Sequence, residues 1–125
     1  MQNAASAYAR VSQTALSPRE AEAAVLMKAA RLLQTARDGW NDEAKPPRQE
    51  LADALGFNRK VWTVLATAAT EADSGLPDAV RRSMTQLGAF VITRTIAVLA
   101  EPVPEKVEPL IAINREVAAG LRGQA

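Results

Sequence analysis

Apolar residues recur at intervals of three and four along this chain, and proline or glycine separates each such segment from the next. This spacing places side chains on one face of an α-helix, whereas a half-buried strand needs strict alternation, which no segment keeps for long enough. Hydrophobic residues make up 48% of the 125 positions, and most of them are alanine, leucine or valine. Because alanine is the best helix former, the sequence predicts an all-α protein.

Capping signals indicate where the helices begin and end. The motif Ser-Pro-Arg-Glu at 17–20 has the pattern of a capping box with proline at the first helical position. Gly39 and Gly120 are placed to end helices. Gly56 interrupts a helical pattern, and Asn58 is then placed to cap a new helix.

The whole chain, residues 1–125, has the length of one ordinary domain. We therefore expect a single-domain bundle of five to six helices. The segment nearest the N-terminus is the weakest of them, because its apolar face is mostly alanine. The predicted helices cover 3–15, 17–39, 48–55, 58–72, 78–100 and 106–119.

The chain contains neither cysteine nor histidine. It therefore has no thiolate or imidazole to act as nucleophile or general base, and it lacks the commonest ligands of transition metals. Carboxylate pairs such as Glu50 with Asp53 and Glu105 with Glu108 lie near helix starts, where acidic residues are ordinary. We expect a protein that is not an enzyme, with no catalytic residues, no metal site and no cofactor.

Net charge and hydropathy limit the kinds of partner that we expect for this protein. The 15 Lys and Arg residues nearly balance the 14 Asp and Glu residues, so the formal charge is +1 and the long-range attraction for phosphate is small. Adjacent basic residues occur at 59–60 and 81–82, which leaves RNA contact as the weaker alternative. The N-terminus lacks a signal-peptide pattern, and no uninterrupted apolar run is long enough to span a bilayer. We expect a cytoplasmic protein without membrane insertion.

Asn58, Arg59 and Trp62 form our candidate partner-binding site. Arg59 would lie in the first turn of the helix capped by Asn58, where a cation gains nothing from the helix dipole. Trp62 lies three residues further on the same face, so guanidinium and indole could form one amphipathic patch. In the alternative, Trp62 is a core residue and Arg59 pairs with a carboxylate of the same fold. Asn114 lies on an apolar stripe, which favours a structural hydrogen bond to a neighbouring helix.

The chain resembles the FlaF family, small flagellar biosynthesis proteins of alphaproteobacterial type, over nearly its whole length. Phe90 departs from the family pattern, which frequently has tryptophan at that place. The residues that carry the resemblance are, in order, Tyr8, the motif at 17–20 with Glu22, Asn58-Arg59 with Trp62, Leu65 and Ala66, Leu76-Pro77, Val80-Arg81, Val91, Ile113-Asn114 and Gly120-Leu121.

The resemblance implies a non-enzymatic role in flagellin production, opposite to that of FlbT, which restrains flagellin translation. On this basis we expect the protein to bind the helical terminal segments of flagellin as a secretion chaperone and to promote flagellin synthesis. The alternative is a post-transcriptional regulator of flagellin mRNA that acts with or against FlbT. A third, weaker hypothesis is an adaptor that only holds FlbT or an export component.

Overall fold

The computed structural model describes residues 17–40, 48–71 and 74–123. These residues form four α-helices and one short 3₁₀ turn, with no strand among them, so the all-α prediction is confirmed. The helix expected at 3–15 lies outside the described residues. The elements are α2 (Pro18–Asp38), α3 (Arg48–Ala69), α4 (Asp78–Ala100), the 3₁₀ turn η1 (Pro104–Lys106) and α5 (Glu108–Leu121).

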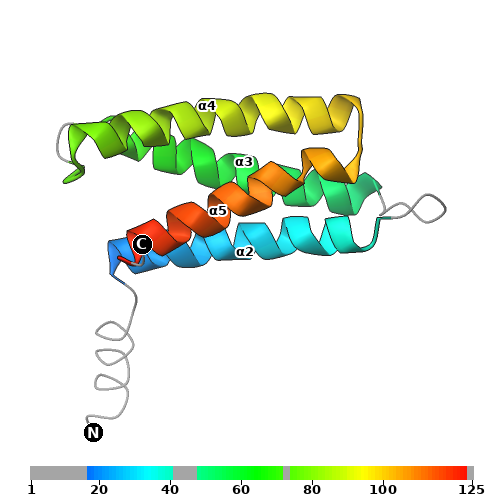
Figure 1. The fold of residues 1–125 in the computed structure, drawn as a ribbon, viewed down its shortest axis with the longest axis horizontal. Helices are drawn as coiled ribbons and strands as arrows, with labels where there is room; N and C mark the ends of the chain where they lie inside the picture. The colour runs from blue at the N-terminus through cyan, green and yellow to red at the C-terminus, as the bar shows by residue number, and fades with distance from the viewer. Residues whose placement is uncertain (1–16, 41–47, 72–73, 124–125) are drawn as a thin grey trace, which may run out of the picture.

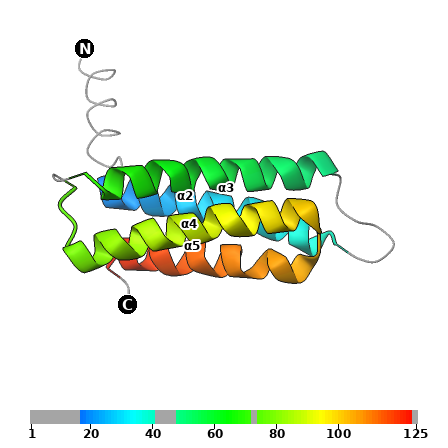
Figure 2. The same cartoon turned by 90° about the horizontal axis from the view of Figure 1, so that it is seen from above.

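The four helices lie side by side along the long axis of the molecule, and consecutive helices run in opposite directions (Figures 1 and 2). α2 packs against both α3 and α5, and α3 packs against α4. α4 meets α5 only locally. α4 is therefore held mainly along one edge, which leaves the seam between α4 and α5 less closed than the others.

Small side chains let the helices approach closely at the centre of the bundle. The core face of α2 is largely alanine, including Ala23, Ala30 and Ala36, each without exposed surface. Leu26 and Leu33 fill the space between them. This alternation of small and large residues is what a close-packed helical interface requires.

The predicted break at Gly56 is wrong, because α3 runs without interruption from Arg48 to Ala69. Leu55 before the glycine and Trp62 and Leu65 after it are buried on one continuous stripe. Each such side chain contributes about 1.5–3 kcal/mol when buried, whereas a glycine within a helix costs about 1 kcal/mol. The free energy gained by burying these side chains therefore exceeds the cost of the glycine. The two predicted helices form one continuous helix. The described residues accordingly form four helices where five to six were expected.

The helix ends follow the capping signals in part. The Ser17 Oγ accepts a hydrogen bond from the Glu20 N–H at 3.2 Å, and Gly39 follows the last residue of α2, as predicted. Gly120 was predicted to end the last helix, but it lies within α5. The residue that follows in the left-handed region is Gly123, with φ at 76°. Since the predicted start at residue 106 lies in η1, α5 is displaced by about two residues from the prediction.

Helix α4 is the most apolar of the described helices that are long enough to span a membrane. By length and composition it is apolar enough to cross a membrane, and it is the one such helix among the described residues. Only 28% of its most apolar window is buried inside the bundle. Two of its apolar side chains, Ile96 and Leu99, are 63% and 55% exposed. α4 thus presents apolar surface outward, a pattern that also suits a helix with a partner.

The two glycines within α3 and α4 have opposite surroundings, which gives a first prediction. A Cβ at Gly56 would meet no atom within 4 Å, so Gly56→Ala should stabilise the protein by about 0.5–1 kcal/mol through its helix propensity. Thermal unfolding followed by circular dichroism should show a melting temperature several degrees higher.

Gly88→Ala is the matched control. A Cβ at Gly88 would lie 2.8 Å from the Ala66 Cβ, so the seam between α3 and α4 would have to widen. Overpacking of this kind typically costs about 1–3 kcal/mol, and the melting temperature should fall. A lower melting temperature for Gly56→Ala would contradict the continuous helix.

Candidate functional site

A chain of hydrogen bonds crosses the core from α3 to α5. The Trp62 indole N–H donates to the Asn114 Oδ1 at 2.8 Å, and the Asn114 Nδ2 donates to the Asn58 Oδ1 at 2.6 Å. All three side chains are without exposed surface. Because an indole can only donate, Trp62 sets the orientation of the Asn114 amide, which in turn sets that of Asn58. The chain ends at the Asn58 Nδ2, a buried donor without a partner among the described residues.

This geometry separates the residues of the predicted binding site. Trp62 is a core residue and Asn114 forms a structural hydrogen bond to another helix, as the alternative interpretations held. Asn58 does not cap a helix but lies within α3. Arg59 is exposed and forms no ion pair with any described residue. Of the three, only Arg59 can touch a partner in this conformation, and its contact stays a prediction.

One member of the basic pair at 81–82, Arg81, forms hydrogen bonds within the fold. The Arg81 guanidinium donates to the carbonyl oxygens of Ala69 at 2.9 Å and Thr70 at 3.0 Å, and it lies 3.3 Å from the Asp78 carboxylate. It therefore satisfies carbonyls at the C-terminal end of α3, where a cation is favoured by the helix dipole. Arg82 remains exposed, so the pair offers a phosphate group little more than one cation.

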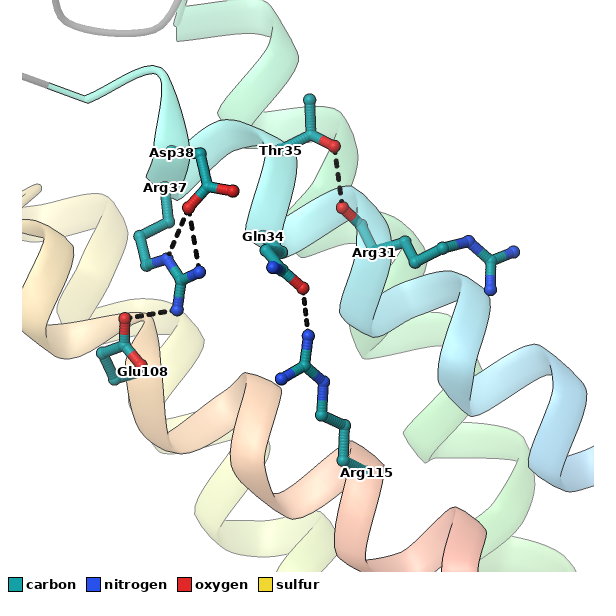
Figure 3. A network of polar contacts seen from close by, with 7 residues as sticks. All are labelled: Arg31, Gln34, Thr35, Arg37, Asp38, Glu108 and Arg115. Atoms are coloured by element: carbon teal, nitrogen blue, oxygen red, sulfur yellow. Dashed lines mark hydrogen bonds and ion pairs between the residues drawn. The ribbon is translucent and has the colours of Figure 1, made fainter.

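Polar contacts close the seam between α2 and α5 (Figure 3). The Arg37 guanidinium lies 2.9 Å from the Asp38 carboxylate and 2.6 Å from that of Glu108 on α5. The hydrogen bond to Asp38 and then that to Glu108 raise the pKa of Arg37 above its ordinary value. One helical turn away from Arg37, Arg115 donates to Gln34. These contacts hold α5 against α2.

The seam between α4 and α5 is hollow. A groove of about 520 Å³ lies between the two helices, and a second hollow of about 470 Å³ continues it. Ser83 and Leu87 line both, so the two form one apolar channel along the molecule. We call it the α4–α5 groove. Its other apolar lining residues are Leu76, Ala79, Val80, Met84, Phe90, Ile113, Val117 and Leu121. Arg19 of α2, Gln86 and Gly120 also line it.

A smaller apolar hollow of about 360 Å³ lies between α2 and α3. Val25, Val61 and Val64 line it together with the Lys60 side chain. Beside it, the Lys28 ammonium lies 5.1 Å from the centre of the Phe57 ring, close enough for a cation–π interaction. We call this surface the α2–α3 face.

No group of three or more carboxylates among the described residues is arranged to hold a metal ion. The described residues also include apolar side chains that remain exposed, on three of the four helices.

Comparison with known proteins identifies a family for this chain. The family model described as "Flagellar protein FlaF" matches residues 4–121, which is nearly the whole chain. The search of curated proteins and the search of solved structures both found no match.

The hydrogen-bond chain predicts that Asn114 is needed for stability. Asn114→Ala would leave the Trp62 N–H and the Asn58 Oδ1 unpaired in the core, at about 1–3 kcal/mol each. We expect a loss of about 2–6 kcal/mol in the free energy of unfolding, measured by urea titration. A double-mutant cycle with Trp62→Phe should give strongly non-additive losses, because both substitutions break the same bond.

Arg59→Ala is the surface comparison for that experiment. It should change the free energy of unfolding by less than about 0.5 kcal/mol, because the side chain is exposed. A loss as large as that of Asn114→Ala would mean that Arg59 has a structural partner after all. An unchanged stability together with weaker flagellin binding would support Arg59 as a contact residue.

Proposed function

The chain belongs to the FlaF family of flagellar proteins, and from this membership we propose that it binds flagellin as a secretion chaperone and promotes flagellin synthesis. The function needs no catalysis. It acts in the cytoplasm, before flagellin is exported, on the terminal segments that form amphipathic helices.

The observation that carries the proposal is the amount of apolar surface on the outside of a well-packed helical bundle. Large apolar side chains between 37% and 66% exposed occur on three of the four helices. A contiguous exposed apolar patch often marks a binding surface, whereas single exposed apolar side chains are ordinary. The side chains are Val25, Leu32, Val64, Val80, Phe90, Ile96 and Leu99.

Helix-in-groove binding explains how such a bundle would act as a chaperone. An unassembled amphipathic helix exposes its apolar face to water and to other copies of itself. A groove formed by two helices can cover that face and leave the polar face solvated. An open groove covers only part of the guest helix, which keeps the complex reversible and allows release for export.

Protection of flagellin also accounts for its promoted synthesis. Flagellin that is kept soluble and ready for export does not accumulate as aggregate, so more of it is produced in usable form. This route needs no contact with mRNA. It is consistent with Arg81, which is occupied at the end of α3 and so does not contribute to a basic surface.

Binding of purified flagellin is the direct test of the proposal. We expect a complex that survives ribonuclease treatment and whose affinity falls only a few-fold when salt rises from 50 to 300 mM, since apolar burial is little affected by salt screening. An RNA site with about three phosphate contacts would instead lose roughly 40-fold over the same range. Isothermal titration calorimetry at both salt concentrations separates the two cases.

Flagellin without its terminal segments is the matched control and should not bind. If full-length flagellin fails to bind at either salt concentration, the chaperone proposal is wrong. If an RNA fragment of the flagellin message binds with a steep salt dependence, the regulator hypothesis replaces it.

A further inference from the structure

We propose that a second copy of this chain packs against the outward face of α4, so that two α4 helices lie antiparallel about a two-fold axis. This inference goes beyond the proposed function and does not depend on flagellin binding. The spacing of the exposed residues along α4 carries it.

Two stripes of residues run along α4 with the same spacing of four and three. The first is buried in the bundle and consists of Met84, Gly88, Val91, Thr95 and Val98. The second begins one residue later and consists of Thr85, Ala89, Ile92, Ile96 and Leu99. We call the second stripe the α4 seam. At about 100° per residue, it lies a little more than a quarter turn around the helix from the buried stripe.

The α4 seam is exposed and largely apolar. Ile96 is 63% exposed and Leu99 is 55% exposed, Ala89 is also exposed, and Ile92 is half-buried. Apolar residues that alternate at intervals of three and four occupy the contact positions of a two-helix coiled coil. Such a narrow stripe suits one partner helix, whereas a helix that lies on a membrane has a broad apolar face beside many Lys and Arg residues.

The α4 seam is complementary to itself when two copies run antiparallel. With the two-fold axis beside residue 94, Ile92 of each copy lies across from Ile96 of the other. Ala89 likewise lies across from Leu99, so the small side chain leaves room for the large one. In a parallel arrangement Ala89 would face Ala89 and leave a gap, which close packing disfavours.

The two ends of the α4 seam carry unpaired charges of opposite sign. At the N-terminal end, Arg82 and Thr85 line a hollow of about 430 Å³. Beyond the C-terminal end lies Glu105 in η1. Arg82 and Glu105 are exposed and form no ion pair with any described residue. The other charged residues at the two ends pair within the chain, Asp78 with Arg81 and Glu101 with Lys106.

This distribution of charge favours the antiparallel arrangement. When Ile92 lies across from Ile96, Thr85 lies across from residue 103 of the second copy. Glu105 of each copy then approaches the hollow that contains Arg82 of the other. A parallel arrangement would instead bring Arg82 beside Arg82 and Glu105 beside Glu105, and like charges across an interface are unfavourable.

Self-association through the α4 seam leaves the α4–α5 groove open. Ser83, Leu87 and Phe90, which line the groove, each precede a residue of the buried stripe by one position. The seam residues each follow the buried stripe by one position. Groove and seam are therefore separated by about 200° around α4 and lie on opposite sides of it. A dimer would present two grooves.

The length of the α4 seam sets the expected strength of the dimer. From Thr85 to Leu99 the helix extends about 21 Å at 1.5 Å per residue, which gives an interface at the low end of the known sizes. We expect a Kd on the order of 10–100 µM. Sedimentation velocity of the full chain at concentrations between about 1 and 500 µM should show a reversible monomer–dimer equilibrium.

Two double variants test whether the α4 seam is the interface. Ile96→Glu with Leu99→Glu places negative charges in the contact, and we expect the Kd to rise at least about tenfold. Val25→Glu with Val64→Glu on the α2–α3 face is the matched control, since these side chains are 40% and 66% exposed. It should change the Kd less than about threefold. Circular dichroism melts check that both variants are folded.

Cysteine cross-linking tests the antiparallel register, because the sequence contains no cysteine of its own. A mixture of the Ala89→Cys and Leu99→Cys proteins should form a disulfide between the two variants under mild oxidation, since facing positions bring the two Cα atoms within about 7 Å. Either variant alone should form little, because its two cysteines would lie about 15 Å apart along the helix axis. Mass spectrometry identifies the disulfide that forms.

The remaining outcomes would overturn the proposal. A monomer at every concentration, or a dimer that the seam variant leaves unchanged, would show that α4 does not join two copies. A disulfide formed readily by Leu99→Cys alone would show a parallel arrangement. If the protein is monomeric and the seam variant loses binding to a flagellin terminal peptide or to anionic lipid vesicles, the seam serves that partner instead. Failure of the dimer leaves the proposed function intact, because flagellin binding is measured separately.

Discussion

The bond from the Trp62 indole to Asn114 is the interaction on which the rest of this bundle depends. It joins α3 to α5 through the centre of the core, and it does so with a fixed donor that sets the direction of both asparagine amides. Polar groups in a core are costly unless they are paired, so this arrangement admits one register of α3 against α5. Apolar packing alone would tolerate small shifts along the helix axes.

With α3 and α5 held in register, the remaining helices are held unequally. α2 forms an ion pair with α5 through Arg37 and packs against α3. α4 packs against α3 through the close approach at Gly88. The free edge of α4 is what leaves apolar side chains on the outside of the molecule. The same bundle thus combines a closely packed core with exposed apolar surface on α4.

The sequence predicted those features that depend on local chemistry. The cap at Ser17 and the bounds of α4 follow from neighbouring residues, and the structure has them as expected. The continuity of α3 across Gly56 and the burial of Trp62 depend on residues more than fifty positions away in the chain, such as Asn114. Helical periodicity shows which side chains share a face, but it does not show which face another helix will cover. The groove could not be predicted for the same reason, since it arises where two helices meet only locally.

The two hydrogen bonds that join Trp62, Asn114 and Asn58 have a consequence for how such a core can change over evolutionary time. The hydrogen bonds depend on all three side chains, Asn58, Trp62 and Asn114. Replacement of any one of them leaves a buried polar atom of another without its hydrogen-bond partner. A viable path to an apolar core therefore requires the three positions to change in concert. Among relatives that share this fold, the three should vary as one unit, with either all polar partners present or all replaced.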